Sequence, residues 1–84
     1  MNVVTTKQFK KAYDKLPQNL KKKTKKAIDF LAQNLFYPGL NSKKMKGNVW
    51  EARIDRSYRF TFEKQGETFI LRTVGPHDKG LGKK

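Results

Sequence analysis

The segment from Trp50 to Phe62 alternates between apolar and polar side chains, and this alternation is the strongest constraint on the fold. Successive side chains of a β-strand point to opposite faces of a sheet, so a period of two predicts strands with one buried face. The buried face would carry Trp50, Ala52, Ile54, Tyr58, Phe60 and Phe62. The opposite face would carry Glu51, Arg53, Arg59, Thr61 and Glu63. The pattern therefore predicts two adjacent strands that hold arginines at fixed sheet positions.

The N-terminal half predicts two antiparallel helices joined at a proline. Thr6 is a suitable N-cap for a helix over about residues 7–16, in which apolar side chains recur at helical spacing. Pro17 ends this helix and can occupy the first position of the next one, which we expect over about residues 17–35. Its buried stripe would consist of Leu20, Thr24, Ala27, Ile28, Leu31 and Leu35.

The C-terminal half predicts a three-stranded meander over about residues 49–54, 58–64 and 67–74. Residues 41–48 read as a polar, lysine-bearing loop, and residues 3–5 could add a short edge strand. A helical hairpin followed by a meander predicts an α+β domain over residues 1–84, with the helices covering one face of an antiparallel sheet.

The facing of the third strand is ambiguous in the sequence. Phe69 and Leu71 would lie on one side, whereas Ile70, Arg72 and Val74 would lie on the other. If Phe69 and Leu71 face the helices, Arg72 shares the open face with the arginines of the first two strands.

The charge of the chain predicts a polyanionic partner. Its 84 residues include 20 Lys and Arg but only 7 Asp and Glu, which gives a formal net charge of +13. Repulsion at this density destabilises a compact state unless an anion is bound, so nucleic acid or an acidic protein is the expected partner. A chain of this length forms one small domain and leaves no room for a catalytic cleft between two domains.

The sequence offers no thiolate or multi-histidine metal site, since it has no Cys and a single His. We therefore expect no cofactor and no metal. No stretch has the length and apolarity of a signal peptide or a membrane span, so the expected location is the cytoplasm, with no membrane partner.

Two lysine groups are candidates for contacts with phosphates. In the second helix, five lysines lie between residues 21 and 26, and like charges four residues apart oppose the helix. Of these, the candidate nucleic-acid contacts are Lys22, Lys25 and Lys26. Lys44 and Lys46 of the following loop could add ammonium groups at the edge of the arginine face. In both cases the alternative is a solvated surface without a ligand.

Arg59 is the leading candidate for a catalytic phosphate contact. It lies between Tyr58 and Phe60, so neighbouring side chains would hold its stem while its planar fork clamps a phosphate. The alternative is a cross-strand ion pair with Glu51 or Glu63. Arg53 and Arg72 are further candidates on the same face.

His77 follows the last predicted strand and is the one side chain whose ordinary pKa lies near neutrality. It could act as a general acid or base in phosphodiester cleavage, with Asp78 setting its tautomer. The alternative is a surface histidine after a Gly-Pro turn.

Four strings of the sequence stand out together. They are Lys44-Met45-Lys46-Gly47, Trp50-Glu51-Ala52-Arg53-Ile54, Tyr58-Arg59-Phe60-Thr61-Phe62 and Val74-Gly75-Pro76-His77-Asp78. With the helical hairpin cornered at Leu16-Pro17, they resemble the RelE/ParE superfamily of bacterial toxin–antitoxin toxins. The resemblance extends over the whole chain and implies a RelE-like fold.

The resemblance also implies an activity. RelE-like members enter the ribosomal A site and cut messenger RNA without a metal: the ribose 2′-OH attacks the adjacent phosphate and leaves a 2′,3′-cyclic phosphate. On this basis Arg59 matches the arginine that stabilises the phosphate in the transition state. His77 matches a C-terminal His or Arg that acts on proton transfer or charge.

Further roles follow from the same resemblance. Lys44 and Lys46 fall in the region of the family's lysines, and Arg53 in that of an auxiliary phosphate contact, while Glu51 could be a base. The chain departs from many ribonuclease members because no tyrosine follows the C-terminal histidine, which leaves no aromatic ring there to stack on an RNA base.

The function implied is therefore a ribosome-dependent endoribonuclease toxin, with ribosome and messenger RNA as targets and a cognate antitoxin as its protein partner. ParE-like relatives inhibit DNA gyrase with the same fold, so gyrase inhibition is the first alternative. A degenerate member that only binds nucleic acid is the second.

Overall fold

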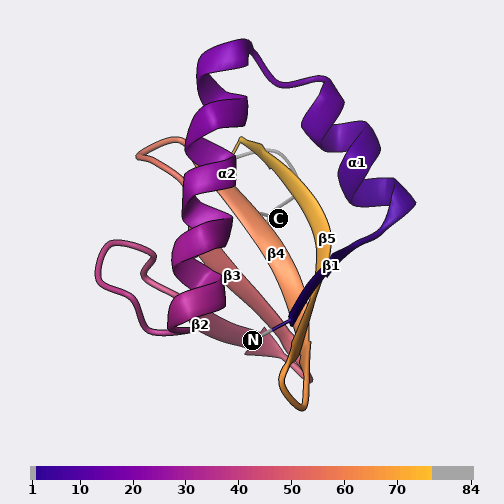
Figure 1. The fold of residues 1–84 in the computed structure, drawn as a ribbon, viewed down its shortest axis with the longest axis vertical. Coiled ribbons are helices and arrows are strands. Elements are labelled where there is room, and N and C mark those ends of the chain that lie inside the picture. Colours follow the sequence, from indigo (N-terminus) through magenta and orange to yellow (C-terminus); the bar gives the residue numbers. More distant parts are fainter. Residues whose placement is uncertain (1, 77–84) are drawn as a thin grey trace.

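A computed structural model describes residues 2–76, which form two helices and a five-stranded sheet (Figure 1). The elements are β1 (Asn2–Thr5), α1 (Lys7–Asp14), α2 (Gln18–Gln33), β2 (Lys43–Lys46), β3 (Val49–Arg53), β4 (Tyr58–Gln65) and β5 (Thr68–Pro76). The strand order is β1-β5-β4-β3-β2, with β1 parallel to β5 and the other pairs antiparallel. The predicted α+β class, helical hairpin and N-terminal edge strand are confirmed.

The ends of the helices follow from local hydrogen bonds. Thr6 is the N-cap of α1: its hydroxyl accepts the N–H of Phe9 at 3.1 Å and donates to the carbonyl of Leu71 at 2.9 Å, which fixes the helix start against β5. Pro17 is the N-cap of α2 instead of its first helical residue. α2 ends two residues before the predicted Leu35, because Asn34 adopts an extended backbone and its side chain accepts the N–H of Phe36 at 2.9 Å.

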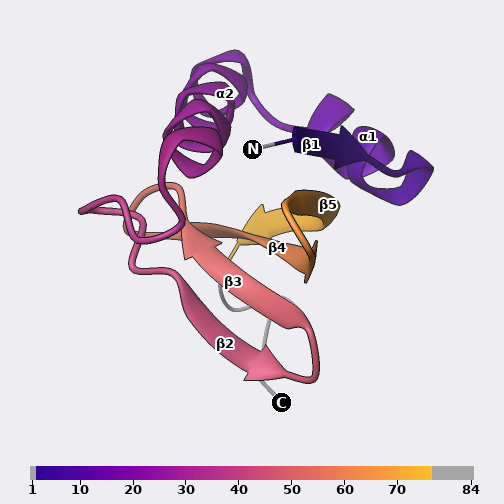
Figure 2. The ribbon, with the colours of Figure 1, turned by 60° about the horizontal axis from the view of Figure 1, so that its bottom comes forward.

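Both helices lie on one side of the sheet (Figure 2), and the core fills the space between them. Its fully enclosed large side chains are Phe60, Phe62, Phe69, Leu31 and Leu71. These residues come from β4, β5 and α2, as the alternation and the helical stripe predict. Neither helix in the described part of the chain is long and apolar enough to cross a membrane.

A β-bulge resolves the ambiguous facing of the last strand. Thr61 pairs with Thr73 and Phe62 pairs with Leu71, so Arg72 is an extra residue on β5. The bulge shifts the alternation, and both Leu71 and Val74 are buried on the helix side. Strict alternation from Leu71 would have placed Val74 on the sheet face opposite the helices.

Residues 43–46 were expected to belong to a loop, and this expectation is wrong. They form β2, an antiparallel edge strand on β3, and the connection between the two strands passes through Gly47 at φ +58°. All four residues of β2 are exposed, so no apolar alternation marks the strand in the sequence. Lysines on an edge strand also discourage pairing with other chains.

Candidate functional site

The candidate site lies on the sheet face opposite the helices, which we call the open face. Directly opposed residues of antiparallel strands share a face, so the register defines its rows. Arg53 of β3 lies opposite Arg59 of β4, and Glu51 lies opposite Thr61. On the other side of β3, Lys43 of β2 lies opposite Glu51. These two rows of the open face thus bring together two arginines, one carboxylate and one lysine from three strands.

The guanidinium of Arg59 is held by the loop that joins β3 to β4. Its Nη1 donates to the carbonyl oxygens of Asp55 at 2.9 Å, Tyr58 at 3.2 Å and Arg56 at 3.4 Å. Among residues 2–76, all its hydrogen bonds come from Nη1, so the Nε–Nη2 edge has no protein acceptor there. The predicted alternative, an ion pair with Glu51 or Glu63, does not form. A fixed guanidinium with one open edge suits bidentate binding of a phosphate.

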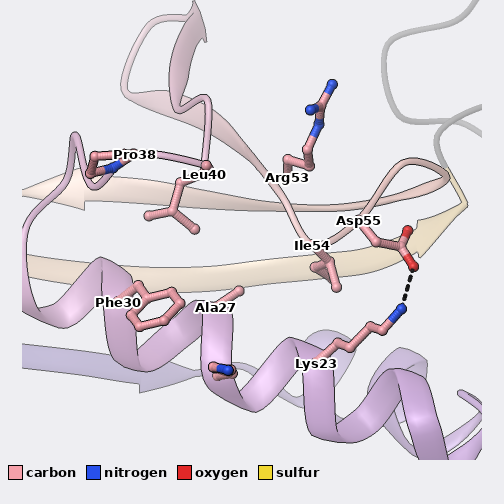
Figure 3. A pocket seen from close by; sticks show the side chains of 10 residues that line it. Lys23, Ala27, Phe30, Pro38, Leu40, Arg53, Ile54 and Asp55 are labelled. Carbon is pink, nitrogen blue, oxygen red and sulfur yellow. Dashed lines mark hydrogen bonds and ion pairs between the residues drawn. The ribbon is translucent and has the colours of Figure 1, made fainter.

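Asp55 closes the loop that holds Arg59. Its Oδ1 accepts the N–H groups of Ser57 at 2.8 Å and Tyr58 at 2.9 Å, and its Oδ2 lies 3.5 Å from Nζ of Lys23 on α2 (Figure 3). Partial burial acts to raise the pKa of Asp55, but the two backbone hydrogen bonds and Lys23 outweigh it, so the pKa lies below its ordinary value. The carboxylate therefore stays charged at neutral pH.

Glu51 is an enclosed carboxylate on the open face. Its residue is 5% exposed, and its Oε2 has no hydrogen-bond partner in the part of the chain that the structure describes. Arg59 lies on the neighbouring strand, two residues before the Thr61 that is opposite Glu51, so Arg59 and Glu51 are diagonal neighbours on this face. The unpaired Oε2 makes Glu51 a candidate proton acceptor for a ligand held by Arg59, provided that ligand binding exposes this buried oxygen.

The lysines of β2 divide between the two sheet faces. Lys43 pairs with Glu51 and Lys46 with Val49, which places both on the open face. Lys44 pairs with Trp50 and therefore lies on the helix side. The structure thus adds Lys43 to the candidate surface and separates Lys44 from the arginines.

Arg72 stands at the bulge and forms an ion pair with Glu63 across to β4. Its charge is therefore partly compensated, in contrast to that of Arg53, which is exposed and extends away from α2 (Figure 3). The two arginines predicted as auxiliary contacts differ in what they can offer an anion.

The predicted α2 lysines lie on the helix side of the sheet, away from Arg59. Lys22, Lys25 and Lys26 are exposed, and Nζ of Lys26 lies 6.0 Å from the ring centre of Phe30. A groove of about 320 Å³ runs between α2 and the end of β3, and Lys26 and Arg53 both line it (Figure 3). The α2 lysines and the open face are therefore separate basic surfaces that meet at this groove.

The sequence matches no protein-family model and no curated protein. Solved structures do match. RelE in the RelB–RelE antitoxin–toxin complex from Methanococcus jannaschii has a TM-score of 0.73 and 27% identity, over 89% of this chain and 91% of that one. YafQ from E. coli strain BL21(DE3) has a TM-score of 0.80 and 15% identity, over 96% and 98%. A YoeB/ParE toxin from Agrobacterium tumefaciens has a TM-score of 0.75 and 19% identity, and the match covers 92% of this chain and 99% of that one.

The chain has the fold of toxins of the RelE/ParE superfamily. The agreement covers nearly the whole length of each chain, helical hairpin and sheet included. The family resemblance predicted from four short strings of sequence is confirmed at the level of structure. The M. jannaschii RelE was solved with its antitoxin RelB, so at least one neighbour with this fold is bound by an antitoxin.

Within this RelE/ParE fold, sequence reasoning placed Arg53 and Arg59 on the open face, as the structure has them. It placed Arg72 there only on the condition that Phe69 and Leu71 face the helices, and both are buried on that side. The predicted His77 lies outside the described residues. Reasoning from the sequence missed Lys43, because no strand was expected there, and Asp55. A signal for Asp55 did exist: an aspartate followed by a serine two residues later is typical of a turn closed by the carboxylate.

Proposed function

We propose that this protein is the toxin of a type II toxin–antitoxin system and cleaves messenger RNA on the ribosome as a metal-independent cytoplasmic endoribonuclease. The observation that carries the proposal is the pairing of Arg53 with Arg59 on the same sheet face as Glu51. Two cations and a carboxylate in adjacent rows supply charge stabilisation and a proton acceptor for one phosphodiester. The toxins among its structural neighbours support the same assignment.

The proposed reaction begins with the ribose 2′-OH. Its proton passes to Glu51, and its oxygen attacks the adjacent phosphorus, while negative charge builds on the non-bridging oxygens. The open Nε–Nη2 edge of Arg59 and the guanidinium of Arg53 stabilise this charge. The bond from phosphorus to the 5′ oxygen then breaks, leaving a 2′,3′-cyclic phosphate. The leaving oxygen takes a proton, the role that the family resemblance gives to His77.

The remaining cations serve binding. Lys43 and Lys46 flank the arginines from β2, and Lys22, Lys25 and Lys26 add a second basic surface on α2. Cations spread over two surfaces can hold ribosomal and messenger RNA phosphates together, with affinity that falls as salt rises. Of the two predicted β2 lysines, Lys44 is the less suited to contact a phosphate held by the arginines, because it lies opposite Trp50 and therefore on the helix side of the sheet.

A cognate antitoxin is the expected protein partner. It would cover the open face with an acidic or amphipathic segment, because the arginines have to be neutralised to prevent RNA binding. Co-expression of an acidic antitoxin should then restore growth to cells that express the toxin.

The test is expression in a bacterium with mapping of messenger RNA ends. The proposal expects cuts within translated messages, 2′,3′-cyclic phosphate ends and loss of cutting when translation initiation is blocked. Double-strand DNA breaks with intact messages would point to gyrase inhibition. Normal growth at high expression would point to a degenerate, binding-only protein.

A further inference from the structure

The loop between β3 and β4 holds the guanidinium of Arg59, and the carboxylate of Asp55 closes this loop. We propose that Asp55 is a positioning residue for Arg59: its Oδ1 closes the β3–β4 loop, and the closed loop fixes the guanidinium at the site. The inference rests on the proposed function for its consequence in catalysis. Its structural part stands on the hydrogen bonds of this loop alone.

The contacts form two linked sets. Asp55 accepts from the N–H groups of Ser57 and Tyr58 at 2.8 and 2.9 Å, and the backbone N–H groups of Ile54 and Asp55 donate to the carbonyl of Tyr58. The acceptors of the Arg59 guanidinium are the carbonyls of Asp55, Arg56 and Tyr58. All three carbonyls belong to the turn that the carboxylate closes. Opening the turn would move the acceptors, and the guanidinium with them.

Fixing Arg59 matters because an arginine side chain has many rotamers. A guanidinium already held through Nη1 does not have to be ordered when charge develops on a phosphate, so its stabilisation is available at once. If the loop opened, Arg59 could still attract RNA as a mobile cation. The loss would then fall on the chemical step more than on binding.

The hydrogen-bonding oxygen of Asp55 matters more here than its charge. The bridge to Lys23 is long, at 3.5 Å, and its side chains are 53% and 27% exposed for Lys23 and Asp55, so it contributes little. The two backbone hydrogen bonds are short. Asparagine keeps an acceptor oxygen at the same place, whereas glutamate keeps the charge but moves the carboxylate by one methylene. Comparing Asp55→Asn with Asp55→Glu therefore separates the role of the hydrogen-bonding oxygen from the role of the charge.

The first experiment follows the Arg59 side chain by ¹⁵N NMR in the full chain, with Asp55→Asn, Asp55→Glu and Asp55→Ala compared. Wild type and Asp55→Asn should show hindered rotation of the guanidinium, whereas Asp55→Glu and Asp55→Ala should show fast averaging. Asp29→Ala, which removes an exposed acid from α2, is the matched control and should leave the signals unchanged. If Asp55→Ala fails to fold, Asp55→Glu carries the comparison.

The second experiment measures single-turnover cleavage on ribosomes and affinity for a 2′-O-methyl RNA that cannot be cut. Asp55→Glu should lower the cleavage rate about tenfold and change affinity less than about threefold, and Asp55→Asn should restore the rate. In an Arg59→Ala background the same substitution should have no further effect, because the two residues act as a unit.

The outcomes separate the two proposals. Unchanged Arg59 signals in both Asp55→Glu and Asp55→Ala overturn the positioning role, as does an Asp55→Asn variant that behaves like Asp55→Ala. Absence of cleavage by the wild type overturns the proposed function, while the NMR comparison still decides whether Asp55 positions Arg59.

Discussion

Arg53 and Arg59 lie directly opposite each other on β3 and β4. Like charges at opposed positions of an antiparallel pair destabilise the sheet. The loop carbonyls relieve part of this cost by accepting hydrogen bonds from Arg59. A bound anion between the two guanidinium groups would relieve the rest, so the pair favours a phosphate as ligand.

The two auxiliary arginines should differ in their contribution to binding. Arg53→Ala should weaken affinity for 2′-O-methyl RNA about tenfold, because it removes an exposed charge-assisted contact. The matched control is the double substitution Arg72→Ala with Glu63→Ala, which removes an ion pair at constant net charge. It should change affinity less than about twofold. Equal effects in a fluorescence titration would mean that the open face does not bind RNA through Arg53.

The lysines of α2 should determine the salt dependence of ribosome binding. Replacing Lys22, Lys25 and Lys26 by Gln should lower the slope of log affinity against log salt by about 2 to 3, since each neutralised phosphate contributes about 0.7 to 0.9. The measurement is a titration at several salt concentrations, with Lys7, Lys10 and Lys11 of α1 replaced in the control. A slope that stays the same would exclude this surface from contact with RNA.

The free energy of unfolding should decrease at low pH as the Asp55 carboxylate becomes protonated. Its pKa is lowered in the folded state, so its contribution is complete above the ordinary value of 3.8 and is lost as pH falls through the lower folded value. The free energy of unfolding of wild type relative to Asp55→Ala should therefore be constant above about pH 5 and shrink below pH 4. In a Lys23→Met background the shrinkage should be smaller and should be complete at a higher pH, because one cause of the lowered folded-state pKa is removed. A difference independent of pH from 6 to 2.5 would contradict this role.

The core should be as intolerant as its burial indicates. Leu31 of α2 is 0% exposed, and Leu31→Ala should cost about 2–5 kcal/mol in urea unfolding. Phe36, which is 66% exposed, serves as the control, and Phe36→Ala should cost about 1 kcal/mol or less. Similar losses for both would mean that the helices are not packed as described.

The sequence predicted the elements whose apolar periodicity is strong. The alternation of Trp50 to Phe62 set the facing of β3 and β4, and the stripe that includes Leu31 set the buried side of α2. Two features were out of reach of periodicity: β2, in which all residues are exposed, and the bulge at Arg72, which shifts the alternation by one residue. Both are determined by pairing with a neighbouring strand, which a local pattern does not record.

The candidate site was predicted in its parts but not in its connections. An arginine between Tyr58 and Phe60 marked Arg59, yet the acceptors that fix it are backbone carbonyls, which carry no sequence signature. Glu51 could be placed on the open face by alternation, but its burial depends on the neighbouring strands.

In the proposed reaction, Arg59 acts in the chemical step and not only in binding. The most direct test is single-turnover cleavage of messenger RNA on saturated ribosomes by wild type and Arg59→Ala, with affinity measured in parallel. Loss of a preorganised electrostatic group should lower the rate about 100-fold or more and leave affinity within about fivefold. Equal losses of rate and affinity would contradict the claim and reduce Arg59 to a phosphate anchor.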